Sequence, residues 1–206
     1  MDKKIVITIG RELGSGGREI GKLISEKLGI GYYDKELLSV AAKESGLCEE
    51  ILEQHEEIPT RSFLYSLVMG VSGYSNGTFT NVPLEQKVFL AQFDAIKKIA
   101  DKESCVIVGR CADYALEERD NVFSVFIHAP KDYRVKNVSK KNNISINDAS
   151  DLIAKTDKRR ASYYNYYTNK KWGAASSYNL SIDGSLFDKN EIADIIVKVA
   201  SKYFER

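Results

Sequence analysis

The sequence contains few of the residues that mark disulfide-rich or zinc-binding proteins. Its 206 residues include three cysteines, three prolines, two histidines and one tryptophan. An odd number of cysteines without a CxxC pair argues against a disulfide framework and favours reduced thiols. The two histidines, His55 and His128, are isolated and lack the spacing of a zinc site.

The sequence also lacks long apolar runs. No run approaches the ~20 residues of a membrane span, and the N-terminal MDKK precedes only a short apolar stretch. We therefore expect no membrane segment and no secretory signal, and we expect a cytoplasmic protein. With 43% hydrophobic and 29% charged residues, the composition is that of a globular protein. The length of 206 residues fits one domain, or one domain with a small insertion.

The net charge of +1 is distributed unevenly along the chain. Residues 131–172 contain 11 Lys/Arg and 4 Asp/Glu, a local balance of +7, which leaves a balance of −6 for the rest. This local excess predicts an anionic ligand near residues 131–172. The chain as a whole lacks the strong basic excess of most nucleic-acid binders, so a nucleic-acid partner is disfavoured.

Strand patterns alternate with helix patterns along the whole chain. Apolar, β-branched runs predict strands at KKIVITIG, IGYYD, SCVIVGR, VFSVFIHAP and YNLSIDGS, and helical spacing of apolar residues predicts helices between them. Residues 59–83 are predicted to be irregular. The alternation predicts an α/β domain with a mostly parallel sheet and helices on both faces. Ligands bind such sheets beyond the C-terminal strand ends, here Gly10, Asp34, Arg110 and His128.

A glycine-rich segment, GRELGSGGREIGKLIS, joins the first predicted strand to a helix. Backbone N–H groups in such a turn, together with the helix N-terminus, bind anions. Against the pattern G-x-x-x-x-G-K-[ST], with Gly17 as the second glycine, Arg18 takes the lysine position and Glu19 the Ser/Thr position. The alternative is a tight turn without a ligand. The predicted phosphate-binding residues are Gly14, Ser15, Gly16, Gly17, Arg18 and Glu19.

The two exchanged residues alter the chemistry of this loop. Arg18 keeps a positive charge but lacks the compact ammonium group of lysine. Glu19 replaces the hydroxyl that normally binds Mg²⁺; its carboxylate either ligates Mg²⁺ itself or repels phosphate. Both alternatives for Glu19 are open at this point.

Segments in a fixed order resemble the cytidylate kinase-like family of P-loop nucleoside monophosphate kinases. They are GRELGSGGREIGKLISEKLGIGYYDKELL, CVIVGRCADYAL, VFIHAP and DKRRASYYNYYTNKKWG, followed by YNLSID. The resemblance implies a single domain, 1–206, with a three-layer P-loop NTPase fold and a five-stranded parallel sheet. It implies a monophosphate-binding insertion at about 35–83 and a basic lid at about 131–172. It also implies transfer of the ATP γ-phosphoryl group to CMP or a related monophosphate, with Mg²⁺.

The resemblance assigns candidate roles to individual residues. Arg18 and Arg159 are the candidate catalytic residues, because cations stabilise the transferring phosphoryl group. Lys155 and Arg159 are four residues apart and share a helix face. The candidates for acceptor binding are Asp34, Arg61, Arg110 and Asp113, and those for the lid are Arg134, Lys155, Arg159 and Arg160.

Structural roles compete with these assignments. Arg110 suits a structural ion pair, Asp34 suits an N-cap for the helix KELL, and the charged segment suits a solvated helix face. The tyrosines of YYNYY suit either base stacking or a hydrophobic core. For the whole protein, the alternative to a kinase is a nucleotide- or phosphate-binding regulatory module without turnover, which the missing lysine and hydroxyl favour.

Overall fold

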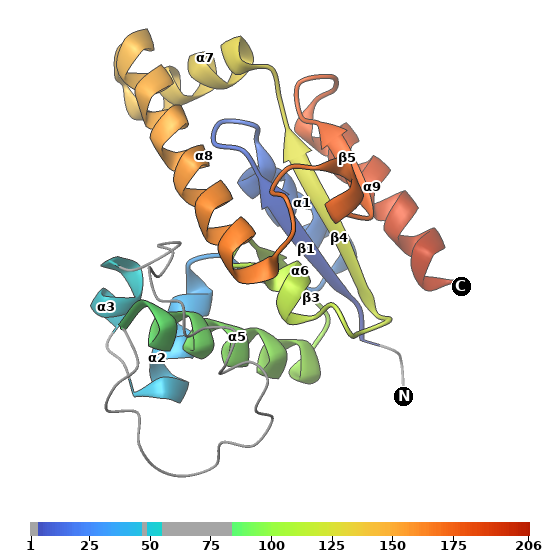
Figure 1. The fold of residues 1–206 in the computed structure, drawn as a ribbon. Coiled ribbons are helices and arrows are strands. Elements are labelled where there is room, and N and C mark those ends of the chain that lie inside the picture. The colour runs from blue at the N-terminus through green and yellow to red at the C-terminus, as the bar shows by residue number, and fades with distance from the viewer. Residues whose placement is uncertain (1–3, 47–48, 55–83) are drawn as a thin grey trace.

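A computed structural model describes residues 4–46, 49–54 and 84–206 (Figure 1). Within these residues, five strands form one parallel sheet in the order β2-β3-β1-β4-β5. This confirms the predicted α/β fold with a parallel sheet. The strands are β1 (Val6–Arg11), β2 (Gly31–Tyr33), β3 (Cys105–Val108), β4 (Val122–His128) and β5 (Leu180–Asp183).

Helices cover both faces of the sheet and complete a three-layer architecture (Figure 1). One face packs against α1 and α9, and the other against α2, α5 and α6. The described helices are α1 (Gly17–Leu28), α2 (Glu36–Ser45), α3 (Glu49–Gln54), α5 (Leu84–Lys102), α6 (Ala112–Ala115), α7 (Lys131–Asn142), α8 (Ile146–Thr168) and α9 (Lys189–Phe204), with a 3₁₀ helix at Ala175–Ser177.

The central strand β1 is buried on both faces. Ile7 and Ile9 pack toward α1 and α9, and Val6 packs toward α2 and α5, because successive side chains of a strand point to opposite faces. This explains why the strand is almost entirely apolar. The glycine loop follows its C-terminal end and leads into α1. Gly29, which caps the C-terminus of α1, has a φ of 61°, a left-handed conformation that glycine adopts readily.

Two short elements, α6 and the 3₁₀ helix, were not predicted. Each is too short to give a periodic pattern of apolar residues. His55, Arg61 and the predicted irregular segment 59–83 lie outside the described residues. Among the residues that are described, none of the helices has the length and apolar character needed to cross a membrane.

Candidate active site

The glycine loop connects β1 to α1 at the C-terminal edge of the sheet. Gly14 and Gly16 have φ angles of 84° and 89°, which side chains other than glycine rarely adopt. A Cβ on Gly14 would also lie 2.7 Å from the carbonyl oxygen of Arg134, so the loop packs directly on α7. The hydroxyl of Ser15 donates to the carbonyl of Glu12 at 2.9 Å and closes the turn from inside.

Arg134 fastens this loop to the rest of the fold. Its Nε donates to the carbonyl of Ala129 at 3.0 Å and lies 3.2 Å from a Glu12 carboxylate oxygen. Its Nη1 donates to Leu13 and, at 2.6 Å, to Asp157, whose other carboxylate oxygen accepts the Leu13 N–H at 2.9 Å. Arg134 is buried and is absent from the lining of both cavities described below. The residue predicted for the lid thus fixes the conformation of the glycine loop.

A cavity of about 540 Å³ opens on the glycine loop, and we call it the loop cavity. Its walls come from the loop, α7, α8 and the first residue of α9. Six basic side chains and two acidic ones line it, so a polyanion is the ligand that fits its charge. These are Arg11, Arg18, Lys140, Lys141, Arg160 and Lys189, with Glu12 and Glu19.

Glu19 forms an ion pair across the cavity. Its carboxylate accepts a hydrogen bond from Lys141 Nζ at 2.6 Å, which joins α1 to α7. Burial raises the pKa of Glu19, but the hydrogen bond and charge of Lys141, with a smaller effect of Lys189, outweigh burial and lower the pKa overall. Glu19 is therefore ionised at neutral pH.

Asp34 lies between two arginines. Its Oδ2 is 2.5 Å from Arg18 Nε, and its Oδ1 is 3.5 Å from Arg110 Nη1. The N-cap of α2 is Lys35, and no side-chain cap bond is formed there, so the N-cap role predicted for Asp34 is wrong. Asp34 is buried and its Oδ1 accepts no hydrogen bond from the described residues. The carboxylate instead connects the glycine loop to the end of β3.

The turn after β3 has an unusual backbone. Gly109, Arg110 and Cys111 have successive φ angles of 80°, 55° and 54°. A left-handed conformation costs a residue other than glycine roughly 1–2 kcal/mol, and such strain concentrates at functional sites. A Cβ on Gly109 would lie 2.1 Å from Arg11 Nη1, so the Arg11 guanidinium packs directly on this turn.

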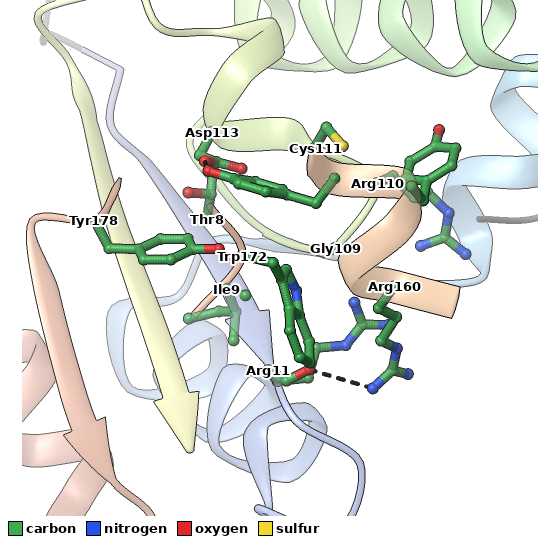
Figure 2. A pocket seen from close by; sticks show the side chains of 13 residues that line it. Thr8, Ile9, Arg11, Gly109, Arg110, Cys111, Asp113, Arg160, Trp172 and Tyr178 are labelled. Atoms are coloured by element: carbon green, nitrogen blue, oxygen red, sulfur yellow. Dashed lines mark hydrogen bonds between the residues drawn. The ribbon is translucent and has the colours of Figure 1, made fainter. Parts of the chain in front are cut away.

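A second cavity of about 20 Å³, the inner cavity, lies between the ends of β1 and β3 and the C-terminal part of α8 (Figure 2). It has room for about one water molecule. Tyr164 donates a hydrogen bond to Asp113 at 2.7 Å, and the ring of Tyr178 lies beside them. Burial raises the pKa of Asp113, partly offset by the Tyr164 hydrogen bond. Burial, followed by the Asp113 charge, also raises the pKa of Tyr178.

The basic residues of α8 differ in their positions. Arg160 lines both cavities and its Nη1 donates to the carbonyl of Arg11 at 3.3 Å (Figure 2). Lys155 and Arg159 are exposed and line neither cavity. The structure thus brings Arg160 to the loop and leaves Arg159 at the surface.

The tyrosines at the end of α8 form a core. Tyr163, Tyr164 and Tyr167 are buried, and the Tyr167 ring stacks on Phe89 with a centroid distance of 3.8 Å. Of the two alternatives for this aromatic segment, the hydrophobic core is therefore confirmed for these three residues.

The cytidylate kinase-like family model matches residues 6–186. The chain belongs to this family. Cytidylate kinases of Methanobrevibacter smithii and Methanosarcina barkeri are each 23% identical to it over 94% of this chain and over 96% and 94% of their own lengths.

Solved structures agree with the family in fold. An uncharacterized protein from Eubacterium ventriosum has a TM-score of 0.71 at 30% identity and covers 96% of this chain and 99% of its own. A shikimate kinase from Bacteroides thetaiotaomicron has a TM-score of 0.54 at 14% identity, covering 98% and 99%. The latter likeness concerns the fold alone.

Several residues that line the loop cavity were not predicted from the sequence. Asn137 donates to the carbonyl of Gly14 at 3.0 Å, and the side chain of Lys189 packs against Gly16. Neither has a local signal, because both reach the loop from more than 100 residues away in sequence. Arg11 did have a signal, because it directly follows Gly10, the end of a predicted strand.

Proposed function

We propose that this protein transfers the γ-phosphoryl group of ATP to a nucleoside monophosphate, with CMP or a related monophosphate as the acceptor. The observation that carries the proposal is the loop cavity, in which six basic side chains surround a glycine loop at a helix N-terminus. Family membership supports the same reaction class. A cytoplasmic location is part of the proposal, because ATP and nucleoside monophosphates are soluble metabolites of that compartment.

ATP would bind with its phosphates on the loop from Gly14 to Glu19. The backbone N–H groups and the N-terminus of α1 favour the negative charge there. Arg160 from α8 and Lys189 from α9 line the same cavity. Residues 131–172, which include α7 and α8, then act as the basic lid.

The acceptor would bind beyond β2 and β3, next to the ATP phosphates. Asp34 and Arg110 lie at the ends of these strands, and Oδ1 of Asp34 is buried without a hydrogen bond from the described residues, so it can accept one from a ligand. Asp113 lies deeper, in the inner cavity. Arg61 and the proposed insertion at about 35–83 complete this half of the proposal.

The reaction needs no general base. A phosphate oxygen of the acceptor forms a bond to the γ-phosphorus of ATP, and the bond from that phosphorus to the β–γ bridging oxygen breaks. The bridging oxygen keeps the electron pair and leaves with ADP, and the acceptor becomes a diphosphate. Because charge shifts onto the leaving ADP, fixed cations at the loop lower the barrier.

Mg²⁺ would be held mainly by the nucleotide phosphates and water, as is usual at such sites. The protein's residues fit this arrangement in one respect: Glu19 faces the loop cavity and is ionised, as its lowered pKa indicates. Binding would require Glu19 to exchange its Lys141 partner for the metal. A bound Mg²⁺ would supply positive charge that offsets the charge of the ATP phosphates.

A nucleotide-binding regulatory role without turnover is the second candidate. The observation that favours it is the ion pair between Arg18 and Asp34. Arg18 is the residue that the sequence predicts at the lysine position, and the ion pair engages its charge. In that case the cavity binds ATP but transfers nothing.

To separate the kinase from the regulatory module, ADP formation from ATP is measured with a panel of nucleoside monophosphates, with and without Mg²⁺. The kinase predicts ADP formation that depends on one or more acceptors and on Mg²⁺. If no acceptor promotes ADP formation while ATP raises the melting temperature, the regulatory role is supported instead. A ligand at a hundredfold excess over Kd should stabilise the fold by ~2.7 kcal/mol.

A further inference from the structure

The start of α1 fixes how the glycine loop aligns with the phosphate-binding motif. The helix begins at Gly17, and Gly16 is its left-handed N-cap residue. In G-x-x-x-x-G-K-[ST], the last glycine ends the loop and the lysine opens the helix. Gly16 is therefore the last motif glycine, which puts Gly17 at the lysine position and Arg18 at the Ser/Thr position. The alignment predicted from sequence, with Arg18 at the lysine position, is off by one residue.

The same alignment puts Arg11 at the first glycine position of the motif. Residues 11 and 17, usually glycine and lysine, are here arginine and glycine. A Cβ on Gly17 would lie 2.6 Å from Arg11 Cβ and 3.2 Å from Arg11 Cγ, whereas the next neighbour, Ile127, is at an ordinary 3.6 Å. The stem of Arg11 thus fills the space in which a lysine side chain at residue 17 would begin.

The charged end of Arg11 lies where the loop meets the end of β3. Arg11 is 7% exposed, lines both cavities, and packs its guanidinium against Gly109. Arg160 donates a hydrogen bond to the backbone carbonyl of the same residue, and Figure 2 shows both arginines among the side chains that line the inner cavity. Arg11 therefore adds a buried positive charge between the phosphate loop and the proposed acceptor side.

We propose that Arg11 and Gly17 are an exchanged pair, in which Arg11 supplies from the strand the cation that the motif lysine supplies from the helix. Arg11 then contacts the β- and γ-phosphates of bound ATP and is a catalytic residue of the transfer. This inference rests on the proposed function for its catalytic part. Its binding part, which concerns the terminal phosphate of ATP, is testable without turnover.

The test compares Arg11→Gln, Gly17→Lys and the double variant Arg11→Gly/Gly17→Lys with the natural protein. Arg11→Gln keeps the Cβ–Cγ–Cδ stem but removes the guanidinium, and it should lower kcat by roughly 10²–10³-fold, as removal of one transition-state donor does. Gly17→Lys alone meets the Arg11 stem and should lower the melting temperature. The double variant removes that clash and restores a lysine, so the melting temperature should recover and kcat should recover at least tenfold. The effects of the two substitutions should therefore be non-additive.

Binding of a non-hydrolysable ATP analogue separates this inference from the proposed function. Arg11→Gln should weaken the analogue at least tenfold and leave AMP affinity unchanged, because AMP lacks the two phosphates concerned. Arg119→Gln, which loses an arginine paired with Asp101 at the opposite end of the sheet, is the matched control and should change neither affinity.

If the natural protein makes no ADP with any acceptor but shows this Arg11-dependent binding, the kinase proposal fails and the assignment of Arg11 to the terminal phosphates stands. If Arg11→Gln binds the analogue as tightly as the natural protein, the exchange is refuted, whatever the activity. A double variant no more stable than Gly17→Lys alone would also refute it.

Discussion

The two halves of α8 have opposite character. Residues 146–160 are mostly exposed and carry charged side chains, whereas residues 161–168 bury three tyrosines against Phe89 and Cys111. The first half reaches over the glycine loop, where Asp157 and Arg160 contact it. One helix therefore both packs into the hydrophobic core and presents charged side chains to a cavity.

The two halves of α8 also lie near carboxylates whose pKa values shift in opposite directions. Beside the aromatic half, burial raises the pKa of Asp113. At the loop cavity, Lys141 overcomes the effect of burial and lowers the pKa of Glu19. An apolar environment therefore favours the neutral acid at one site, and a cationic one favours the carboxylate at the other.

The largest effect is expected in the aromatic half. Tyr167→Ala removes a ring that is 1% exposed and stacked on Phe89, so the free energy of unfolding should fall by about 3–5 kcal/mol. Urea denaturation measures this loss. Tyr166→Ala is the matched control, because that ring is only partly buried and its loss should be smaller. Equal losses in the two variants would show that position 167 does not anchor the helix.

The charged half should affect catalysis more than stability. If the proposed function holds, Arg160→Ala should lower kcat/KM for ATP by roughly 10²-fold, since Arg160 lines both cavities. Arg159→Ala, one residue away and exposed, should change it by less than about threefold. Steady-state kinetics measures kcat/KM for both variants. A larger loss in Arg159→Ala than in Arg160→Ala would support Arg159, the residue predicted from the sequence, as the catalytic one.

The pH dependence of stability should change with Asp113→Asn. Because the folded-state pKa of Asp113 is raised, its favourable contribution is present below its ordinary value of 3.8 and is lost as pH rises through the folded-state pKa. Asparagine does not ionise and still accepts the Tyr164 hydrogen bond. The variant should therefore gain stability relative to the natural protein between pH 4 and pH 7, as measured by denaturation at each pH. A gain that shrinks with rising pH would have the wrong sign.

The smallest effect is expected from Glu19→Gln. The lowered pKa of Glu19 means that its contribution is present above its ordinary value of 4.5 and is lost as pH falls through the folded-state pKa. Because both partners are substantially exposed, the loss should be only about 0.5 kcal/mol at low salt and should vanish at high salt. Thermal melts in both salts measure it, with Glu205→Gln as the control for an exposed pair away from the loop.

The sequence predicts the strands and most helices well, because β-branched runs and the glycine after α1 are local signals. It also predicts where Gly14, Gly16 and Arg110 lie, since strand ends gather at one edge of a parallel sheet. It does not predict Asp157, which bonds to Leu13 across 144 residues. Nor does it fix the motif alignment, because Gly16 and Gly17 are adjacent and either glycine can precede a helix.

The central position of β1 has a consequence for synthesis of the chain. Val6 pairs with Cys105 on one side and Val122 on the other. At roughly 5–20 residues per second, β1 leaves the ribosome about 5–20 s before β3, the first of its two partner strands, leaves it. The glycine loop acquires its side-chain hydrogen bonds later still, after Arg134 and Asp157 have emerged from the ribosome. The strand β1 and the glycine loop thus reach their final conformation well after they are translated, and the apolar strand is unpaired in the interval.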